Sequence, residues 1–161
     1  INNIQIENFK IMEVDEIDGA CFLVNKNEFK SHKILDENFF LYFETTDLCH
    51  QLKMNKKKMY VIDNLKFTHK GLASSTQEYQ IEILVNRNWH YSWSKFYFYK
   101  KNNSYFYAIR KLSPNLFRSL LSYLYSIIIF DKNNAILNKA IMSGIFNAIL
   151  LRKSFYRPSI D

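Results

Sequence analysis

Apolar and polar positions change their spacing near the middle of the chain. In the first half, short apolar runs alternate with charged and polar stretches. Runs of this length, rich in β-branched and aromatic residues, are typical of strands. The pattern therefore predicts strands at residues 20–24, 59–62 and 65–68. Between the first two runs, residues 44–54 follow helical spacing, which predicts one helix there.

The second half has helical periodicity almost throughout. One predicted helix opens at Ser113, because a serine followed by Pro114 is typical of an N-cap and a first helical position. We expect an α/β fold, with residues 1–75 forming an α/β part and residues 76–161 forming a helical, aromatic and basic extension. The helices predicted in the extension cover residues 77–102, 104–111, 113–130 and 134–153.

The predicted helix 113–130 is apolar on more than one side. One stripe is expected to face the core, and it consists of Leu116, Leu120, Leu124 and Ile127. A second set broadens the apolar surface, and it consists of Phe117, Leu121, Ile128 and Ile129. The run is shorter than the roughly 20 residues that cross a bilayer. Two interpretations stay open, namely a core helix and a helix that contacts a membrane interface.

Composition and charge exclude several classes of protein. The 161 residues are 48% apolar, so the chain can build a core and is not intrinsically disordered. Its three glycines cannot form a glycine-rich phosphate loop, and its two cysteines form no CxxC pair. The cysteine usage suits a reducing compartment. A net charge of +7 favours nucleic acid, anionic lipid or phosphorylated substrates as partners.

Two carboxylates stand at the start of the predicted helix 44–54. Glu44 and Asp47 are three residues apart, so both project from one face of its first turn. One interpretation is charge matching to the helix dipole. The other is a general base, because the preceding residues are strongly apolar and aromatic, and such surroundings can tune a carboxylate.

A histidine and an aromatic stretch supply the other candidates. His69 closes a predicted strand, where it could bind a metal or a phosphate, or simply remain exposed. Trp89 and Trp93 share one face of the predicted helix 77–102, with Arg87 nearby. Aromatic and basic residues so interleaved occur in single-strand nucleic-acid binders, and they also occur in cores whose lysines extend to solvent.

Taken in order, these segments resemble the C-terminal half of a family 2 glycosyltransferase. The matching runs are GACFLV at 19–24, LDENFFLYFETTDLC at 35–49, and HKG followed by ASS between His69 and Ser75. The similarity is greatest to the bacterial rhamnosyltransferase-like branch, which has "GACFL", "FDEDFFLYFEDxDLC" and "HxGGxS" in this order. WSKFY at 93–97 and YRP at 156–158 are also similar, so the resemblance spans most of the chain.

The resemblance implies a GT-A fold and an inverting transfer of a sugar from a nucleotide-sugar. The acidic motif of the family, matched by Glu44 and Asp47, carries the base, and the family histidine matched by His69 helps to hold a divalent metal, Mn²⁺ or Mg²⁺. Thr45 stands where the family usually has its base aspartate. The role of the base therefore falls to Glu44 or Asp47. Trp89, Trp93 and Arg87 are the candidates for acceptor binding.

The same comparison leads us to expect that this stretch is the acceptor-side part of such an enzyme. No Asp-x-Asp motif occurs in the sequence, so we expect the donor-binding half to be missing and the isolated chain to be inactive. The implied substrates are a nucleotide-sugar, with rhamnose as one candidate sugar, and a cell-surface glycan or polyprenyl-linked acceptor. The implied location is cytoplasmic, with peripheral contact at the inner membrane face. The alternative is a nucleic-acid-binding or structural module built on residues 89–110.

Overall fold

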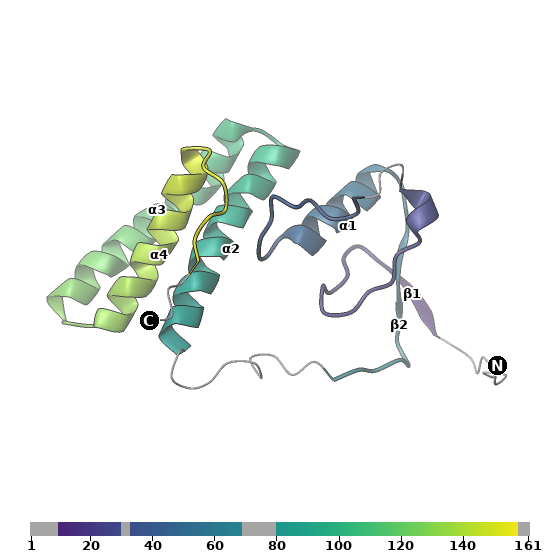
Figure 1. Cartoon of the computed structure of the whole chain (residues 1–161), viewed down its shortest axis with the longest axis horizontal. Helices are drawn as coiled ribbons and strands as arrows, with labels where there is room; N and C mark the ends of the chain where they lie inside the picture. Colours follow the sequence, from purple (N-terminus) through teal and green to yellow (C-terminus); the bar gives the residue numbers. More distant parts are fainter. Residues whose placement is uncertain (1–9, 30–32, 69–79, 158–161) are drawn as a thin grey trace. The chain divides into compact units, whose positions relative to one another are not determined.

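A computed structural model describes residues 10–29, 33–68 and 80–157 of the chain (Figure 1). The described residues form a mixed α/β structure that is mostly helical, with a two-stranded sheet. Contacts divide the chain into two units. The first consists of Ile1–Asp36 with Thr45–Gly71, and the second of Glu37–Glu44 with Leu72–Asp161. The expected mixture of helices and strands is confirmed at this level.

The sheet of the first unit is a short antiparallel ribbon. Strand β1 (Ile11–Val14) pairs with strand β2 (Met59–Ile62), so that Ile11 lies opposite Ile62. Glu13 on β1 accepts a hydrogen bond from Lys58 at 2.8 Å, and this interaction raises the pKa of the lysine. Ladder bonds and flanking charges thus hold a ribbon that is too small to bury a face of its own.

Helix α1 (Glu44–Met54) matches the bounds predicted from the sequence. The loop that follows β1 packs on its first turns, where Thr46 donates a hydrogen bond to Glu16 at 3.1 Å. A Cβ placed on Gly19 would lie only 2.5 Å from Oγ1 of Thr45, so a glycine is needed at this close approach. Leu48 is buried, which gives α1 its apolar side.

Two strand predictions in this unit are wrong. Residues 20–24 and 65–68 are irregular, and Leu23 is 99% exposed instead of buried in a sheet. The strand Ile11–Val14 was not predicted, because Glu13 interrupts its apolar run and the surrounding sequence is polar and acidic. Among the described residues, the ribbon β1–β2 has no third strand for either apolar run to join.

The second unit contains three helices joined by short turns, α2 (Gln80–Asn102), α3 (Tyr105–Ile128) and α4 (Lys132–Ile149) (Figure 1). Their neighbouring arrangement buries one continuous core. Aromatic side chains come from α2 and smaller ones from α3 and α4. The buried members are Trp89, Trp93, Phe96, Ala108, Leu112, Ala140, Ile145 and Ala148.

Small residues allow α4 to approach α2 closely. Ala140, Gly144 and Ala148 are buried at a spacing of four residues, which places them on one stripe of α4. A Cβ on Gly144 would come within 2.4 Å of the backbone oxygen of Trp89 and 3.2 Å of the Cβ of Ser92. The stripe therefore lets the two helix backbones nearly touch, as small residues do at tight helix crossings.

The prediction that a new helix starts at Ser113 is wrong. Helix α3 runs through Pro114 without a break and is capped instead by Ser104, which accepts from the backbone N–H of Tyr107 at 3.2 Å. Pro114 has no N–H to give to the carbonyl of Arg110. The hydroxyl of Ser113 donates to that carbonyl at 3.0 Å, so the acceptor that proline would leave unpaired keeps a partner.

The predicted core stripe of this helix is wrong for three of its four residues, since only Leu116 is half-buried and packs against the core. Leu120, Leu124 and Ile127 are all more than two-fifths exposed, whereas Ser119 and Ser126 are buried. The hydroxyl groups on the inner side are satisfied locally and across the interface. Ser126 donates to the carbonyl of Ser122 at 2.7 Å, and Ser122 accepts from Asn138 on α4 at 2.9 Å. The side of α3 that packs on its neighbours is thus partly polar.

Within the part of the chain that the structure describes, no helix has both the length and the apolar content needed to cross a bilayer.

Candidate functional site

Residues 37–44 form the segment that leads into α1, and they pack against α2. Ser94 on α2 donates a hydrogen bond to the backbone oxygen of Leu41 at 2.8 Å. The buried ring of Phe39 meets Tyr97 edge-on at 4.9 Å. These contacts fix the segment from one side, so its last residues are placed by α2. The sequence boundary near residue 75 did not anticipate that residues 37–44 pack with the helical unit.

The segment ends in an unusual backbone turn. Tyr42 has a φ of 67° and Phe43 a φ of 69°, so two consecutive aromatic residues adopt the left-handed conformation. This conformation costs a non-glycine residue of the order of 1 kcal/mol. Such strain persists where surrounding contacts enforce it, and it clusters at functional sites. Here the rings of Tyr42 and Phe43 both contact Tyr91, at 5.7 and 5.4 Å, and Glu44 follows directly.

Arg87 stabilises this turn. Its Nε donates a hydrogen bond to the phenolic oxygen of Tyr42, and its guanidinium carbon lies 5.9 Å from the centre of the same ring. Arg87 is half-buried, so its charge lies close to the turn and not in open solvent. Of the residues predicted to bind an acceptor, Arg87 is the one that the structure places beside the turn before Glu44.

Glu44 is the first residue of α1, and one of its carboxylate oxygens is unusual. Oε2 is buried and has no hydrogen-bond partner among the described residues. A buried polar group without a partner costs about 1–3 kcal/mol, and more when it is charged. The N-terminus of α1 favours an anion at this position through its dipole. The carboxylate is thus held at a place where it can still accept a hydrogen bond.

Two more acceptor oxygens on α2 share this property. Oε2 of Glu82 and Oδ1 of Asn86 are buried without a partner in the described part of the chain. They lie one turn apart on α2, and Asn86 directly precedes Arg87. Together with Glu44 they give the described part of the second unit three buried acceptor oxygens without a partner. Groups that donate several hydrogen bonds, such as the hydroxyls of a sugar, would satisfy them. Sequence reasoning missed Glu82 and Asn86, because their spacing alone indicates only an exposed helix face.

Asp47 has a different environment. It is 1% exposed, and its Oδ2 accepts a hydrogen bond from Gln51 at 2.7 Å, one turn further along α1. A carboxylate so enclosed and paired stabilises the helix. The two carboxylates predicted as catalytic therefore differ, since Glu44 has an oxygen that lacks a partner and Asp47 is hydrogen-bonded.

Trp89 and Trp93 lie in the core of the helical unit. Trp89 donates through Nε1 to the hydroxyl of Ser143 at 3.1 Å, and Trp93 donates to the backbone oxygen of Arg152 at 2.9 Å. Their exposed fractions are 1% and 4%, and the rings of Tyr156 and Tyr97 stack on them. In this structure neither indole offers a free face to an acceptor. Nor do they form the exposed face that the nucleic-acid-binding alternative requires.

His90 joins α2 to the segment that follows α4. It is fully buried, with Nδ1 at 2.9 Å from the hydroxyl of Ser154 and Nε2 at 2.9 Å from the backbone oxygen of Tyr156. The carbonyl requires a proton on Nε2, so the neutral ring accepts from Ser154 through Nδ1. Burial lowers the pKa of His90, and the nearby charge of Arg157 lowers it further. His90 therefore has a structural role, joining α2 to the segment after α4.

The metal implied by the glycosyltransferase resemblance finds no ligand set in the described residues. No group of three or more histidine, cysteine, aspartate or glutamate side chains gathers there. His69, the residue predicted to bind the metal, lies outside the described residues. A Mg²⁺ ion held by one or two carboxylates takes its other ligands from water and substrate phosphates, so Glu44 and Asp47 do not by themselves define a metal site. No chemical step is therefore assigned to a metal.

Comparison with protein-family models, with curated proteins and with solved structures found no match.

Proposed function

We propose that this chain forms the acceptor side of a family 2 glycosyltransferase with a GT-A fold. The reaction is the transfer of a sugar, with the deoxyhexose rhamnose as one candidate, from a nucleotide-sugar to a glycan or polyprenyl-linked acceptor. The observation that carries the proposal is the buried, unpaired carboxylate oxygen of Glu44, directly after the strained turn at Tyr42 and Phe43. The run 35–49, which resembles the acidic motif of that family, contains all three residues.

Glu44 is the proposed general base. An acceptor hydroxyl donates a hydrogen bond to Oε2 of Glu44 and transfers its proton there as its oxygen attacks the anomeric carbon. The bond from that carbon to the diphosphate breaks, and the nucleoside diphosphate leaves with the bonding electrons. One displacement at the anomeric carbon inverts its configuration. Because Thr45 cannot act as a base at neutral pH and Asp47 is hydrogen-bonded to Gln51, the unpaired oxygen favours Glu44.

The remaining groups bind and position. Glu82 and Asn86 offer buried acceptors to further hydroxyls of the sugar acceptor, as their unpaired oxygens suggest. Arg87 acts through Tyr42, because it holds the backbone turn that sets the direction of the Glu44 side chain. Such preorganisation contributes to catalysis by fixing the base before the substrate binds.

The test is sugar transfer by the protein produced from its complete reading frame, with nucleotide-sugars and polyprenyl-diphosphate-linked acceptors. The Glu44→Gln variant keeps the shape of the side chain and removes the base. We expect its turnover to fall about 10²- to 10⁴-fold, the range for loss of a general base. The matched control is Asp63→Asn, which changes an exposed carboxylate just after β2 and should keep full activity. Undiminished turnover in Glu44→Gln would refute the assignment of the base.

A further inference from the structure

Helix α3 has an apolar face that the described chain leaves uncovered. Phe117, Leu121, Leu124 and Ile128 recur at spacings of four, three and four residues, so they share one side of the helix. We call these four residues the outer face. Phe117 is 62% exposed, Leu121 51% and Ile128 72%. Side chains of this size on a water-facing helix surface indicate an interaction site.

The opposite side of α3 changes character along the helix. Its N-terminal half buries Ala108 and Leu112, whereas the buried residues of its C-terminal half are Ser119 and Ser126. In the C-terminal half the pattern is therefore inverted. A helix at the surface of a protein in water normally shows the reverse, with its apolar stripe toward the core. The inversion makes sense where the outer face contacts an apolar medium, because small polar residues then form the helix–helix contacts.

The turn between α3 and α4 extends this surface. Ile127, Ile128, Ile129 and Phe130 are four consecutive apolar residues, each at least 48% exposed, and Phe130 reaches 87%. The turn is well defined. Phe130 takes a left-handed φ of 59°, and Asp131 caps α4 by accepting from the backbone N–H of Asn134 at 3.0 Å. A fixed tip of apolar side chains is thus presented at the end of the hairpin, and Lys132 follows at once.

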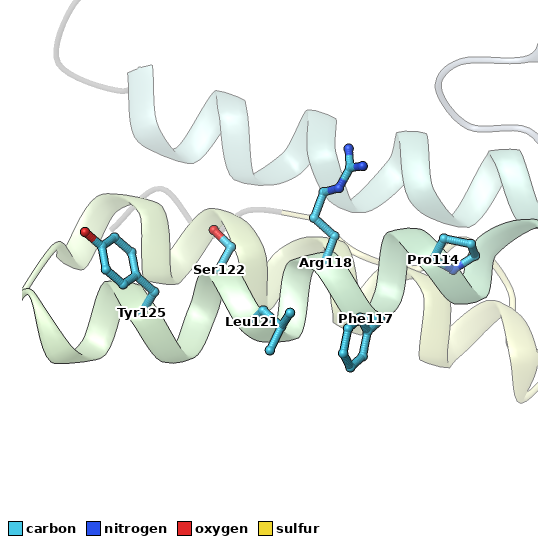
Figure 2. A pocket seen from close by; sticks show the side chains of 6 residues that line it. All are labelled: Pro114, Phe117, Arg118, Leu121, Ser122 and Tyr125. Carbon is cyan, nitrogen blue, oxygen red and sulfur yellow. The ribbon is translucent and has the colours of Figure 1, made fainter.

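A shallow, open depression runs along α3 and shares Phe117 and Leu121 with the outer face (Figure 2). Its volume is about 650 Å³, and all the residues that line it belong to α3. Arg118 is the one charged residue among them. Figure 2 shows the Arg118 side chain extended away from the helix, while Phe117 and Leu121 point in another direction. The lining residues are Pro114, Phe117, Arg118, Leu121, Ser122 and Tyr125.

Charge distinguishes between the occupants that an apolar face could have. From Tyr105 to Arg157 the chain has eight lysines and arginines and a single carboxylate, that of Asp131. Helix α3 itself has no carboxylate. Two copies of this chain meeting through α3 would bring like charges together, which opposes association. An anionic lipid surface attracts the same charges and also receives apolar side chains.

We infer that α3 lies in the interface of an anionic membrane. The outer face is buried among the acyl chains near the headgroups, the tip Ile127–Phe130 inserts, and Arg118 and Lys132 contact lipid phosphates. The helix lies along the surface and does not span it. This inference does not depend on the glycosyltransferase proposal, because it uses only the exposed apolar face and the charge of the helical unit.

The test is co-sedimentation of the 161-residue chain with vesicles. One set contains phosphatidylcholine alone, and the other an equimolar mixture of phosphatidylcholine and phosphatidylglycerol. We expect binding to the mixed vesicles only. Binding should fall at least about tenfold when the salt rises from about 0.05 M to about 1 M, since the screening length then shortens to about 3 Å. Equal binding to both vesicle types would overturn the role of charge.

Two variants with equal charge locate the contact. Leu121→Glu with Ile128→Glu places two carboxylates on the outer face, and both positions are exposed, so the fold should survive. Asn103→Glu with Asn27→Glu adds the same charge at exposed positions away from the outer face and from the turn between α3 and α4. We expect at least about a tenfold loss of binding in the first variant relative to the second. Equal loss in both, or no binding by the unmodified chain at low salt, would overturn the proposal. Self-association of the unmodified chain in sedimentation velocity, abolished only in the first variant, would also overturn the proposal.

Discussion

Arg87 and Tyr42 form a paired contact in which the same ring receives both a hydrogen bond at its oxygen and a cation at 5.9 Å from its centre. Tyr42 adopts a left-handed backbone, and Glu44 follows two residues later. The pair thus connects the middle of α2 to the turn that positions the proposed base. Since the turn is strained, the contacts that enforce it are expected to be visible in stability as well as in activity.

Replacing Tyr42 by phenylalanine tests this connection. The variant keeps the ring and removes the oxygen, so the half-buried Nε of Arg87 loses its partner. We expect the free energy of unfolding to fall by about 1–3 kcal/mol, as for other unpaired polar groups. Urea unfolding followed by circular dichroism measures the change. Tyr125→Phe, at an exposed tyrosine of the same unit, is the control and should have no effect. Equal stability of the two variants would show that the pair contributes nothing.

Substitution of Gly144 by alanine tests the close approach of α4 and α2. The added Cβ would meet the backbone oxygen of Trp89 at 2.4 Å, and a backbone atom cannot move aside as a flexible side chain can. Overpacking of this kind costs about 1–3 kcal/mol, which exceeds the gain in helix propensity that alanine brings. The measurement is the urea midpoint. Asn133→Ala, at an exposed position of α4, serves as the control. A midpoint unchanged in Gly144→Ala would mean that the helices are further apart than described.

The buried His90 predicts a pH dependence of stability. Because burial lowers the pKa of His90 below its usual value of 6.5, the unfolded chain binds a proton more readily than the folded one. The contribution of neutral His90 to the free energy of unfolding is therefore complete above about pH 6.5. It is lost as the pH falls toward the lowered pKa of His90 in the folded state. Urea unfolding at several pH values below 7 should show this loss.

His90→Gln keeps a neutral polar side chain and should weaken the pH dependence over that range. The control is His50→Gln, in the other unit. The unfolding of the helical unit, monitored by tryptophan fluorescence, should keep its pH dependence in this variant. An equally steep loss of stability in His90→Gln would assign the dependence to other groups.

Nucleotide-sugar binding tests the expectation that this chain carries only the acceptor side. The sequence has neither a glycine-rich phosphate loop nor an Asp-x-Asp motif. We expect the 161-residue chain to bind UDP- and dTDP-sugars, with manganese present, more weakly than about 1 mM, a free energy near −4 kcal/mol. Titration calorimetry makes the measurement. Saturable micromolar binding would show that the donor site is built from residues in this sequence.

How far the sequence predicted the structure depends on whether the deciding interaction is local. The helix at Glu44–Met54 follows from its own residues, and its bounds were predicted correctly. The break expected at Ser113 was wrong, because the hydroxyl of Ser113 takes over the carbonyl of Arg110 and lets the helix continue. The orientation of α3 could not be predicted from apolar periodicity, since this helix buries Ser119 and Ser126 and leaves Leu124 exposed.

Only part of the candidate site could be predicted, because only some of its features depend on local sequence. Glu44 could be chosen from its motif and its place after an apolar run. The left-handed turn at Tyr42 and the unpaired oxygens of Glu82 and Asn86 depend on packing between segments about 40 residues apart, which no local pattern reveals. Trp89 and Trp93 looked like binding residues because interleaved aromatic and basic residues occur both in cores and in binding surfaces.

The segment 152–157, which completes the core around α2, is synthesised after α2, α3 and α4. Trp93 donates to the backbone oxygen of Arg152, His90 contacts Ser154 and Tyr156, and the Tyr156 ring stacks on Trp89. On the ribosome these partners emerge only after all three helices have been made. Until then the indole of Trp93 and the imidazole of His90 lack their partners. We therefore expect the nascent bundle to stay incompletely packed until this segment has left the ribosome.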